Sequence, residues 1–241
     1  MNRLPRRLTQ LYCGLLLYGV TMAMMVRAGL GLDPWDVFHQ GVSERIDVPM
    51  GMVTNVTGLV VLLAWIPLRE RPGLGTVSNV LLVGTVMDLT LPHMPHASGA
   101  VAQITLLVAA VVLNGVATGL YITARFGPGP RDGLMTALHR RTGRSLRLIR
   151  TAMEMTVLVA GVLLGGTVGA GTVVYALAIG PLSQYFLRLF AVPGAGRPGG
   201  QGTETGKVPR MDFEERRGAG ILRLRSRRTD RYPEPSCTDV G

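Results

Sequence analysis

Residues 99–124 form one uncharged run, GAVAQITLLVAAVVLNGVATGLYITA. A helix needs about 20 apolar residues to cross a hydrocarbon layer about 30 Å thick, so this run is long enough to span a membrane. Several such runs occur in a chain that is 47% hydrophobic, which argues against a soluble core. We therefore predict an all-α membrane protein with about six transmembrane helices, at 11–28, 50–68, 74–92, 100–124, 148–166 and 170–192.

The arginines are segregated along the chain, whose formal net charge is +10. Many arginines lie in three segments, 1–10, 69–71 and 125–150. These segments fall on the same side of the membrane if every predicted span crosses it. The loops of the other side hold only Arg27 and Arg45. Cytoplasmic loops of membrane proteins are rich in arginine, so both termini are expected in the cytoplasm. We expect the lipid bilayer as partner and no nucleic acid, because no basic face is interleaved with aromatic residues.

The chain contains a long internal repeat. Residues 73–84, GLGTVSNVLLVG, and 169–180, GAGTVVYALAIG, are identical at half of their positions when offset by 96. The same offset pairs Asp36 with Asp132. A period of this length covers three spans, so the second copy enters the membrane from the opposite side, as in many secondary transporters. The sequence thus predicts two inverted three-helix repeats, at about 11–92 and 100–192.

A glycine- and proline-rich segment follows the first span of each repeat: GLGLDPWD at 29–36 and GPGPRD at 127–132. Neither continues a helix easily, and irregular backbone survives in lipid only against protein or a water-filled cavity. Two interpretations stay open. Each segment is an interfacial loop with a surface helix, or it re-enters the membrane with a helix N-terminus aimed into a cavity. The positions concerned are Gly29, Gly31 and Pro34 in the first copy and Gly127 and Gly129 in the second.

Ionisable side chains near or inside spans are the candidates for a polar pathway, because a charge in the membrane is costly. Each has a structural alternative. In the structural alternative, Asp36 and Asp132 are helix N-caps or first-turn acids. Asp88 is an acid at the membrane interface in that alternative. Glu154 is then neutralised by Arg150, four residues earlier on the same helix face. The candidates for a substrate pathway are Asp36, Asp132, Asp88, Glu154 and Trp35.

Two GxGT turns open the third and sixth predicted spans. Their threonines suit helix N-caps, and their second glycines allow close approach of helices. A phosphate-binding loop is rejected because the GxxxxGK[ST] pattern is absent. A glycine–proline pair inside the last span is expected to kink it. These structural positions are Gly75, Thr76, Gly171, Thr172, Gly180 and Pro181.

No group of residues suggests catalysis. No nucleophile and base stand together in the sequence pattern, and no spacing of histidine, cysteine and acidic residues favours a metal. His93 and His96 offer at most a weak metal site. Two cysteines exclude a disulfide framework. We expect no enzyme activity, no cofactor and no metal.

The last part of the chain differs in composition. Residues 193–241 are rich in Gly, Arg and acidic residues and have no periodic apolar pattern. We predict a disordered cytoplasmic tail there, after a transmembrane domain at 1–192. The basic run RLRSRR at 223–228 is a solvated segment or a contact for lipid or a partner.

Three stretches resemble the YczE/YitT-type family of bacterial integral membrane proteins: GLGLDPWDVFHQGVS, GPGPRDGLM and VGAGTVVYALAIGPL. The resemblance covers 11–192 and implies a multi-span protein of the bacterial inner membrane. Members of that family have been linked to the regulation of secondary-metabolite peptide production, and transport is often suggested for them. The second copy lacks the tryptophan of the first, so the two halves are not functionally identical.

Two functions are therefore predicted as alternatives. The first is a small secondary transporter or permease of an unknown small solute, with its site between the two halves. The second is a membrane-embedded protein that regulates or scaffolds a cytoplasmic enzyme system through its arginine-rich segment and tail. A homo-oligomer is compatible with either.

Overall fold

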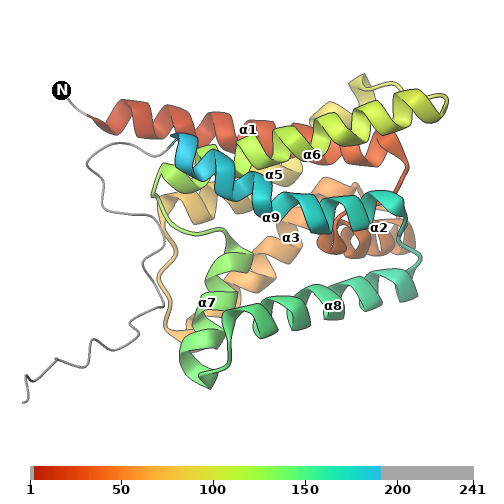
Figure 1. Ribbon diagram of the computed structural model, residues 1–241. Helices are drawn as coiled ribbons and strands as arrows, with labels where there is room; N and C mark the ends of the chain where they lie inside the picture. Colours follow the sequence, from red (N-terminus) through yellow and green to blue (C-terminus); the bar gives the residue numbers. More distant parts are fainter. Residues whose placement is uncertain (1–2, 191–241) are drawn as a thin grey trace, which may run out of the picture. The chain divides into compact units, whose positions relative to one another are not determined.

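A computed structural model describes residues 3–190, which form helices and no strand (Figure 1). The all-α fold is as predicted, and the predicted tail lies outside the described residues. The helices are α1 (Arg3–Ala28), α2 (Pro34–Ile46), α3 (Met50–Leu63), α4 (Trp65–Leu68), α5 (Leu74–Thr90), the 3-10 turn η1 (Leu91–His93), α6 (Ala100–Thr123), α7 (Pro130–Thr142), α8 (Leu146–Leu164) and α9 (Ala170–Phe190).

Five helical stretches in the described residues are long and apolar enough to cross a membrane: Leu4–Ala28, Met50–Leu68, Leu74–His93, Ala100–Thr123 and Ala170–Phe190. They coincide with five of the predicted spans. The remaining prediction, at 148–166, falls on α8, which has the length of a span but carries Arg147, Arg150 and Glu154. These three charges lower its apolar character, so its crossing stays a prediction.

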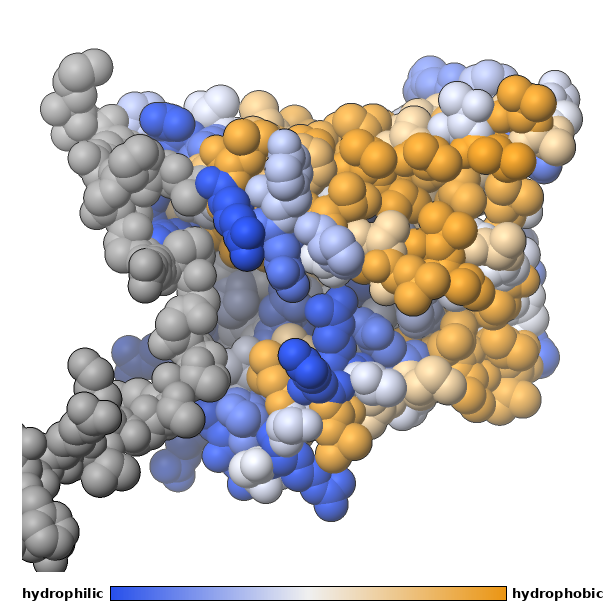
Figure 2. All heavy atoms as spheres, in the orientation of Figure 1, coloured by the Kyte–Doolittle hydropathy of each residue, from blue (hydrophilic) through white to orange (hydrophobic). Residues whose placement is uncertain are grey.

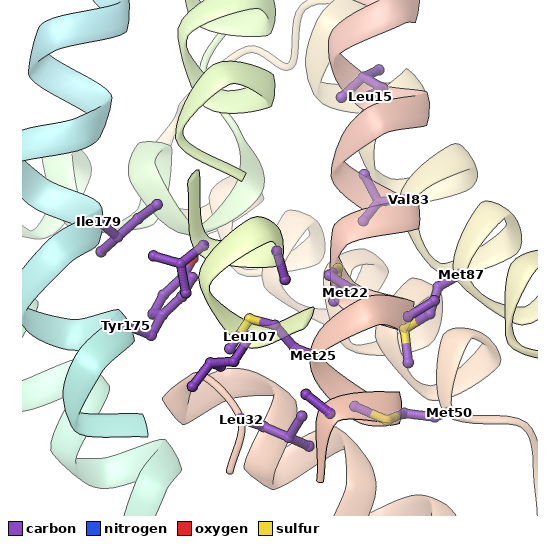
Figure 3. Packing of buried hydrophobic residues seen from close by; sticks show 14 of the residues in the cluster. Leu15, Met22, Met25, Leu32, Met50, Val83, Met87, Leu107, Tyr175 and Ile179 are labelled. Carbon is purple, nitrogen blue, oxygen red and sulfur yellow. The ribbon is translucent and has the colours of Figure 1, made fainter. Parts of the chain in front are cut away.

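Helices α1 and α6 pack side by side and run in opposite directions (Figure 1). Helix α5 packs against α1, and α9 packs against α6. Buried side chains from these helices meet those of the segment before α2 and the start of α3, as Figure 3 shows. Those labelled in the figure are Leu15, Met22, Met25, Leu32, Met50, Val83, Met87, Leu107, Tyr175 and Ile179.

Each glycine-rich turn at the start of a long helix binds the broken segment of the other half. The Gly171 amide donates to the Leu30 carbonyl at 2.7 Å, and the Gly75 amide donates to the Phe126 carbonyl at 2.8 Å. Helix starts leave their first amides without partners inside the helix. The broken segments supply carbonyls to these amides, so the two halves complete each other.

The threonines of the two turns are not N-caps, contrary to prediction. Helix α5 begins at Leu74, which makes Thr76 its third residue, and its hydroxyl donates to the Pro128 carbonyl at 2.7 Å. Thr172 holds the same position in α9 and accepts a hydrogen bond from the Gly169 amide at 3.3 Å. Both helices begin three residues earlier than N-caps at these threonines would place them, at turns where a Cβ on Gly73 or Gly169 would collide with the backbone of the other half.

Glycine is required in the broken segments by backbone conformation. Gly31 has a φ of 110° and Gly127 a φ of 120°, and Gly29 has a φ of 67°. Side chains rarely adopt positive φ, whereas glycine does so at little cost. The predicted role of these positions as breaks in the helices agrees with this geometry.

The two halves differ in how their outer helices pack. Helix α3 packs along α5, where a Cβ at Gly84 would overlap the Gly51 carbonyl. The corresponding pair, α8 and α9, does not pack along its length. A Cβ at Gly180, the partner of Gly84 at offset 96, would meet no atom within 4 Å. The α8–α9 side of the bundle is therefore open, while the α3–α5 side is closed.

These two glycines allow a matched test of the packing. Gly84→Ala should lower the free energy of unfolding by about 1–3 kcal/mol through overpacking, which lowers the melting temperature by roughly 2–10 °C. Gly180→Ala should leave it unchanged or raise it slightly, since alanine favours helix by about 1 kcal/mol. Thermal unfolding of both purified variants in detergent measures the difference. Equal changes in melting temperature for the two variants would contradict the inference that the α3–α5 interface is closed and the α8–α9 side is open.

Candidate functional site

A cavity of about 370 Å³ lies on the open side of the bundle, among α3, α5, α6, α7, α8 and α9. Figure 2 shows hydrophilic residues gathered in a hollow between α9 and α8, with hydrophobic surface on both sides. Its polar lining includes Asp33, Trp35, His39, Thr54, Thr57, Asn79, Thr118, Tyr121, Arg131, Asp132, Arg150, Glu154, Tyr175, Ser183 and Gln184.

The cavity extends along most of α9, from Tyr175 in the second turn to Leu187 in the last turn. At one end its walls include Arg150, near the start of α8, and Leu187, in the last turn of α9. The start of α1 is at the same end, because Arg7 Nε donates to the Ala124 carbonyl after α6 at 3.0 Å. By the arginine distribution, this end is the one predicted to face the cytoplasm.

The short helices α2 and α7 both begin at the cavity wall. Asp33 is the N-cap of α2 and accepts from the amides of Trp35 and Asp36 at 2.8 and 3.0 Å. Helix α7 begins at Pro130 after the N-cap Gly129, which has no side chain to cap it. Each helix N-terminus carries a partial positive charge. Two such ends therefore meet the same cavity.

Arg131 joins the two short helices. Its guanidinium lies over the Trp35 ring, 4.5 Å from the ring centroid, and its Nη1 is 4.0 Å from Asp33 Oδ1. Trp35 and Arg131 are partners at offset 96, so the same position of the repeat supplies both members of a cation–π contact. Trp35 was predicted as a pathway residue, whereas Arg131 and Asp33 were not. Aligning the two copies position by position was the signal that pointed to Arg131.

Asp36 lies behind the cavity wall, fully buried in the first turn of α2. Its Oδ1 is 3.1 Å from Nδ1 of His39, and the same Nδ1 is 3.2 Å from Oγ1 of Thr54. His39 is buried and lines the cavity. Of the alternatives given for Asp36, the first-turn acid is confirmed and the N-cap is wrong, because Asp33 is the N-cap.

Burial shifts the protonation of these groups toward their neutral forms. Loss of solvation raises the pKa of Asp33 to about 6, and the nearby Asp36 raises it as well, while Arg131 lowers it. Burial also raises the pKa of Asp36 to about 6, against the opposing charge of Arg131. The pKa of His39 is lowered to about 3, chiefly by burial and then by Arg131. Charged forms are disfavoured away from water, which accounts for all three directions.

Asp132 and Glu154 reach the cavity from the other half. Asp132 lies in the first turn of α7, as one alternative predicted, and its Oδ2 accepts from the Tyr121 hydroxyl at 3.2 Å. Glu154 accepts from Arg150 Nε at 2.9 Å, the helix pairing given as its alternative. Since both partners of that pair line the cavity, neutralisation does not remove Glu154 from it.

Asp88 is outside this group. Its Oδ1 accepts from the Gly51 amide at 2.7 Å, in the first turn of α3. The N-cap of α3 is Pro49, which offers no side-chain cap, so Asp88 satisfies an amide that α3 leaves open. The structure thus brings Trp35, Asp132 and Glu154 together with Asp36 behind them and leaves Asp88 at a helix start.

Long apolar helices around a polar cavity define a helical membrane protein. The chain belongs to the family of unknown function DUF6198, which it matches over residues 5–188. It is 32% identical to the uncharacterized membrane protein YczE of Bacillus subtilis over 189 residues, 77% of this chain and 87% of that protein. The predicted resemblance is thereby confirmed.

Another relative is an uncharacterized protein of Haemophilus influenzae, 34% identical over 173 residues, which are 72% of this chain and 79% of that protein. No solved structure matches the chain. The similarity extends over most of each chain, so it concerns the helical bundle as a whole.

The capping role of Asp88 yields a stability prediction. Asp88→Ala should lower the free energy of unfolding by about 0.5–2 kcal/mol, the usual cost of losing a side-chain cap. Asp88→Asn should lower it less, because the amide oxygen still accepts from Gly51. The melting temperature of each variant in detergent checks this. A larger loss for Asn than for Ala would contradict the capping role.

Proposed function

We propose that the protein is a small transporter, acting by transport and not by catalysis, that moves a polar solute across the bacterial plasma membrane. The observation that carries the proposal is the polar cavity inside a bundle of apolar helices. Its volume of about 370 Å³ lies in the range of pockets that hold small molecules. Charged groups inside a membrane protein usually mark a solute or ion pathway.

The proposed topology has two inverted repeats, six crossings with α8 as the sixth, and both termini in the cytoplasm. The antiparallel pairing of α1 and α6 supports this topology. The two hydrogen bonds that join each glycine-rich turn to the broken segment of the other half support it as well. Short helices that begin inside the bundle are typical of such transporters, whose discontinuous helices face the substrate. We accordingly take the glycine–proline segments as re-entrant.

The unequal packing of the halves supports alternating access. Helix α2 packs tightly on α8, where a Cβ at Gly41 would lie 2.8 Å from the Gly161 carbonyl. On the other side α3 is closed on α5 and α8 is away from α9. In the proposed second state the halves exchange roles, so that α8 closes on α9 at Gly180 and α3 separates from α5.

The lining favours a solute with an anionic group. Arg131 is a cation whose ion pair with Asp33 is loose, at 4.0 Å, and its side chain is 29% exposed. The uncapped start of α7 lies directly before it. The other cation of the wall, Arg150, is already paired with Glu154 at 2.9 Å. An anion would therefore bind at Arg131, and the hydroxyl and amide groups around it would hold the rest of the solute.

Thiol accessibility tests the water-filled cavity. Single cysteines at Ser183 and Met153, in a chain with Cys13 and Cys237 replaced, should react with a small charged methanethiosulfonate reagent added from the cytoplasmic side. Leu177→Cys, at a position 74% exposed on the apolar surface of α9, should stay unreactive in lipid. Oriented membrane vesicles and mass spectrometry measure the reaction. Unreactive cavity positions from both sides would contradict a solute pathway.

Cross-linking tests the exchange of the two states. In the α3–α5 interface, Asn55 Nδ2 donates to Thr85 Oγ1, next to Gly84, at 3.0 Å. At offset 96, Thr151 is the partner of Asn55 and Gly180 is the partner of Gly84. The pair Asn55→Cys with Thr85→Cys should cross-link in the state described here, and Thr151→Cys with Gly180→Cys only in the other state. An oxidant applied to membranes should therefore trap both pairs. Trapping of the first pair alone under every condition would favour the regulatory or scaffolding role.

A further inference from the structure

Asp36 and His39 form a buried pair that the packing of the bundle does not explain. Their side chains are 0% and 1% exposed. Within the described residues Asp36 Oδ2 and His39 Nε2 have no hydrogen-bond partner. Buried polar atoms without partners cost stability, and native proteins keep few of them without a functional reason.

The hydrogen bonds fix the tautomer of His39 when Asp36 is ionised. The Thr54 hydroxyl donates to the Met50 carbonyl at 3.0 Å, so toward His39 its oxygen is an acceptor. The ionised Asp36 carboxylate is also an acceptor. His39 Nδ1 therefore carries the proton and donates it to both oxygens. Nε2 is then a bare acceptor, buried on a residue that lines the cavity.

The titratable groups around the pair come from several helices and include the phenols of Tyr18 in α1 and Tyr175 in α9, both of which interact electrostatically with Asp36. Asp33 lies at the start of α2, the helix of the pair, and Arg131 faces it from α7. Helix α3 contributes the hydroxyl of Thr54. Helix α8 packs on α2 through glycine, and its ionisable groups, Arg150 and Glu154, pair with each other. His39 thus lines the cavity with Asp36 behind it, beside the acid Asp33 and the loosely paired cation Arg131.

We propose that the Asp36–His39 pair is a proton-binding site that couples solute movement to protons. A hydronium ion that reaches His39 Nε2 from the cavity gives it one proton and becomes water, and the proton on Nδ1 passes to Asp36 Oδ1. The pair gains one proton, its charge changes from −1 to 0, and the histidine ends as the neutral Nε2–H tautomer. No other atom changes its bonding.

The neutral end state agrees with the burial of both groups, which raises the pKa of Asp36 to about 6 and lowers that of His39 to about 3. Loading the pair also removes a negative charge near Arg131. That cation then attracts an anionic solute more strongly. The proton and the solute therefore favour each other, which is the condition for symport. This coupling rests on the proposed transport function, whereas proton binding by the pair does not.

The test of proton binding needs no solute. The full chain, labelled with ¹⁵N-histidine in lipid nanodiscs, is measured by NMR at about pH 8 and about pH 5. The chain has four histidines, and His39→Gln identifies the signal of His39. We expect an Nδ1–H tautomer at the higher pH and an Nε2–H tautomer at the lower pH. An unchanged tautomer or an imidazolium at the lower pH overturns the proposal.

Infrared spectroscopy of the same samples follows the acid. A carbonyl band of a protonated carboxylic acid should appear as the pH falls through about 6, and Asp36→Asn should remove part of it. Asp88→Asn, whose acid caps α3, serves as the control and should leave the band intact. If Asp36→Asn does not fold, the wild-type NMR result still decides. Equal bands in wild type and Asp36→Asn overturn the proposal.

Coupling is tested separately by the α8–α9 cross-link. The fraction of the Thr151→Cys, Gly180→Cys pair that is trapped should differ between about pH 8 and about pH 5, and Asp36→Asn should abolish the difference. A tautomer change without this difference overturns the coupling and leaves the proton site standing. A cross-link that never forms counts against the transport function itself and not against proton binding.

Discussion

The hydrogen bonds between the start of each long helix and the break in the opposite half are the constraint on which the bundle depends. Away from water a backbone amide or carbonyl must find a partner in the protein. Gly171 and Leu30 supply one pair, and Gly75 and Phe126 the other. Because these groups are satisfied, the chain can stop a helix beside the core and start the short helices α2 and α7 at the cavity wall.

The position of those short helices determines the chemistry of the cavity. A helix that begins at the cavity wall brings its first-turn and capping residues to that wall, where continuous apolar helices would supply only apolar side chains. Asp33, Asp36 and Asp132 arrive in this way, as do Trp35 and Arg131. The polar lining is a consequence of where the helices begin, and the surface beside the hollow stays apolar in the face that Figure 2 shows.

Much of this arrangement was predictable from the sequence. Long apolar runs predict the helices. Gly29, Gly31 and Gly127 have positive φ, a local requirement that glycine itself signals in the sequence. The site was predictable only in part. Arg131 was counted as a loop arginine, because its contact with Trp35 exists only once the two halves are folded together. Thr76 was misassigned for the same reason, since the Pro128 carbonyl that binds it is distant in sequence.

The crossed hydrogen bonds also bear on how the protein is made. The first half emerges with the Leu30 carbonyl unpaired, and the Gly171 amide that binds it is synthesised 141 residues later. Until then the first break has no partner from the second half, so it is exposed to lipid, to water or to the insertion machinery. Maturation of the first half is therefore completed by the last helix, and the order of synthesis differs from the order in which the fold becomes stable.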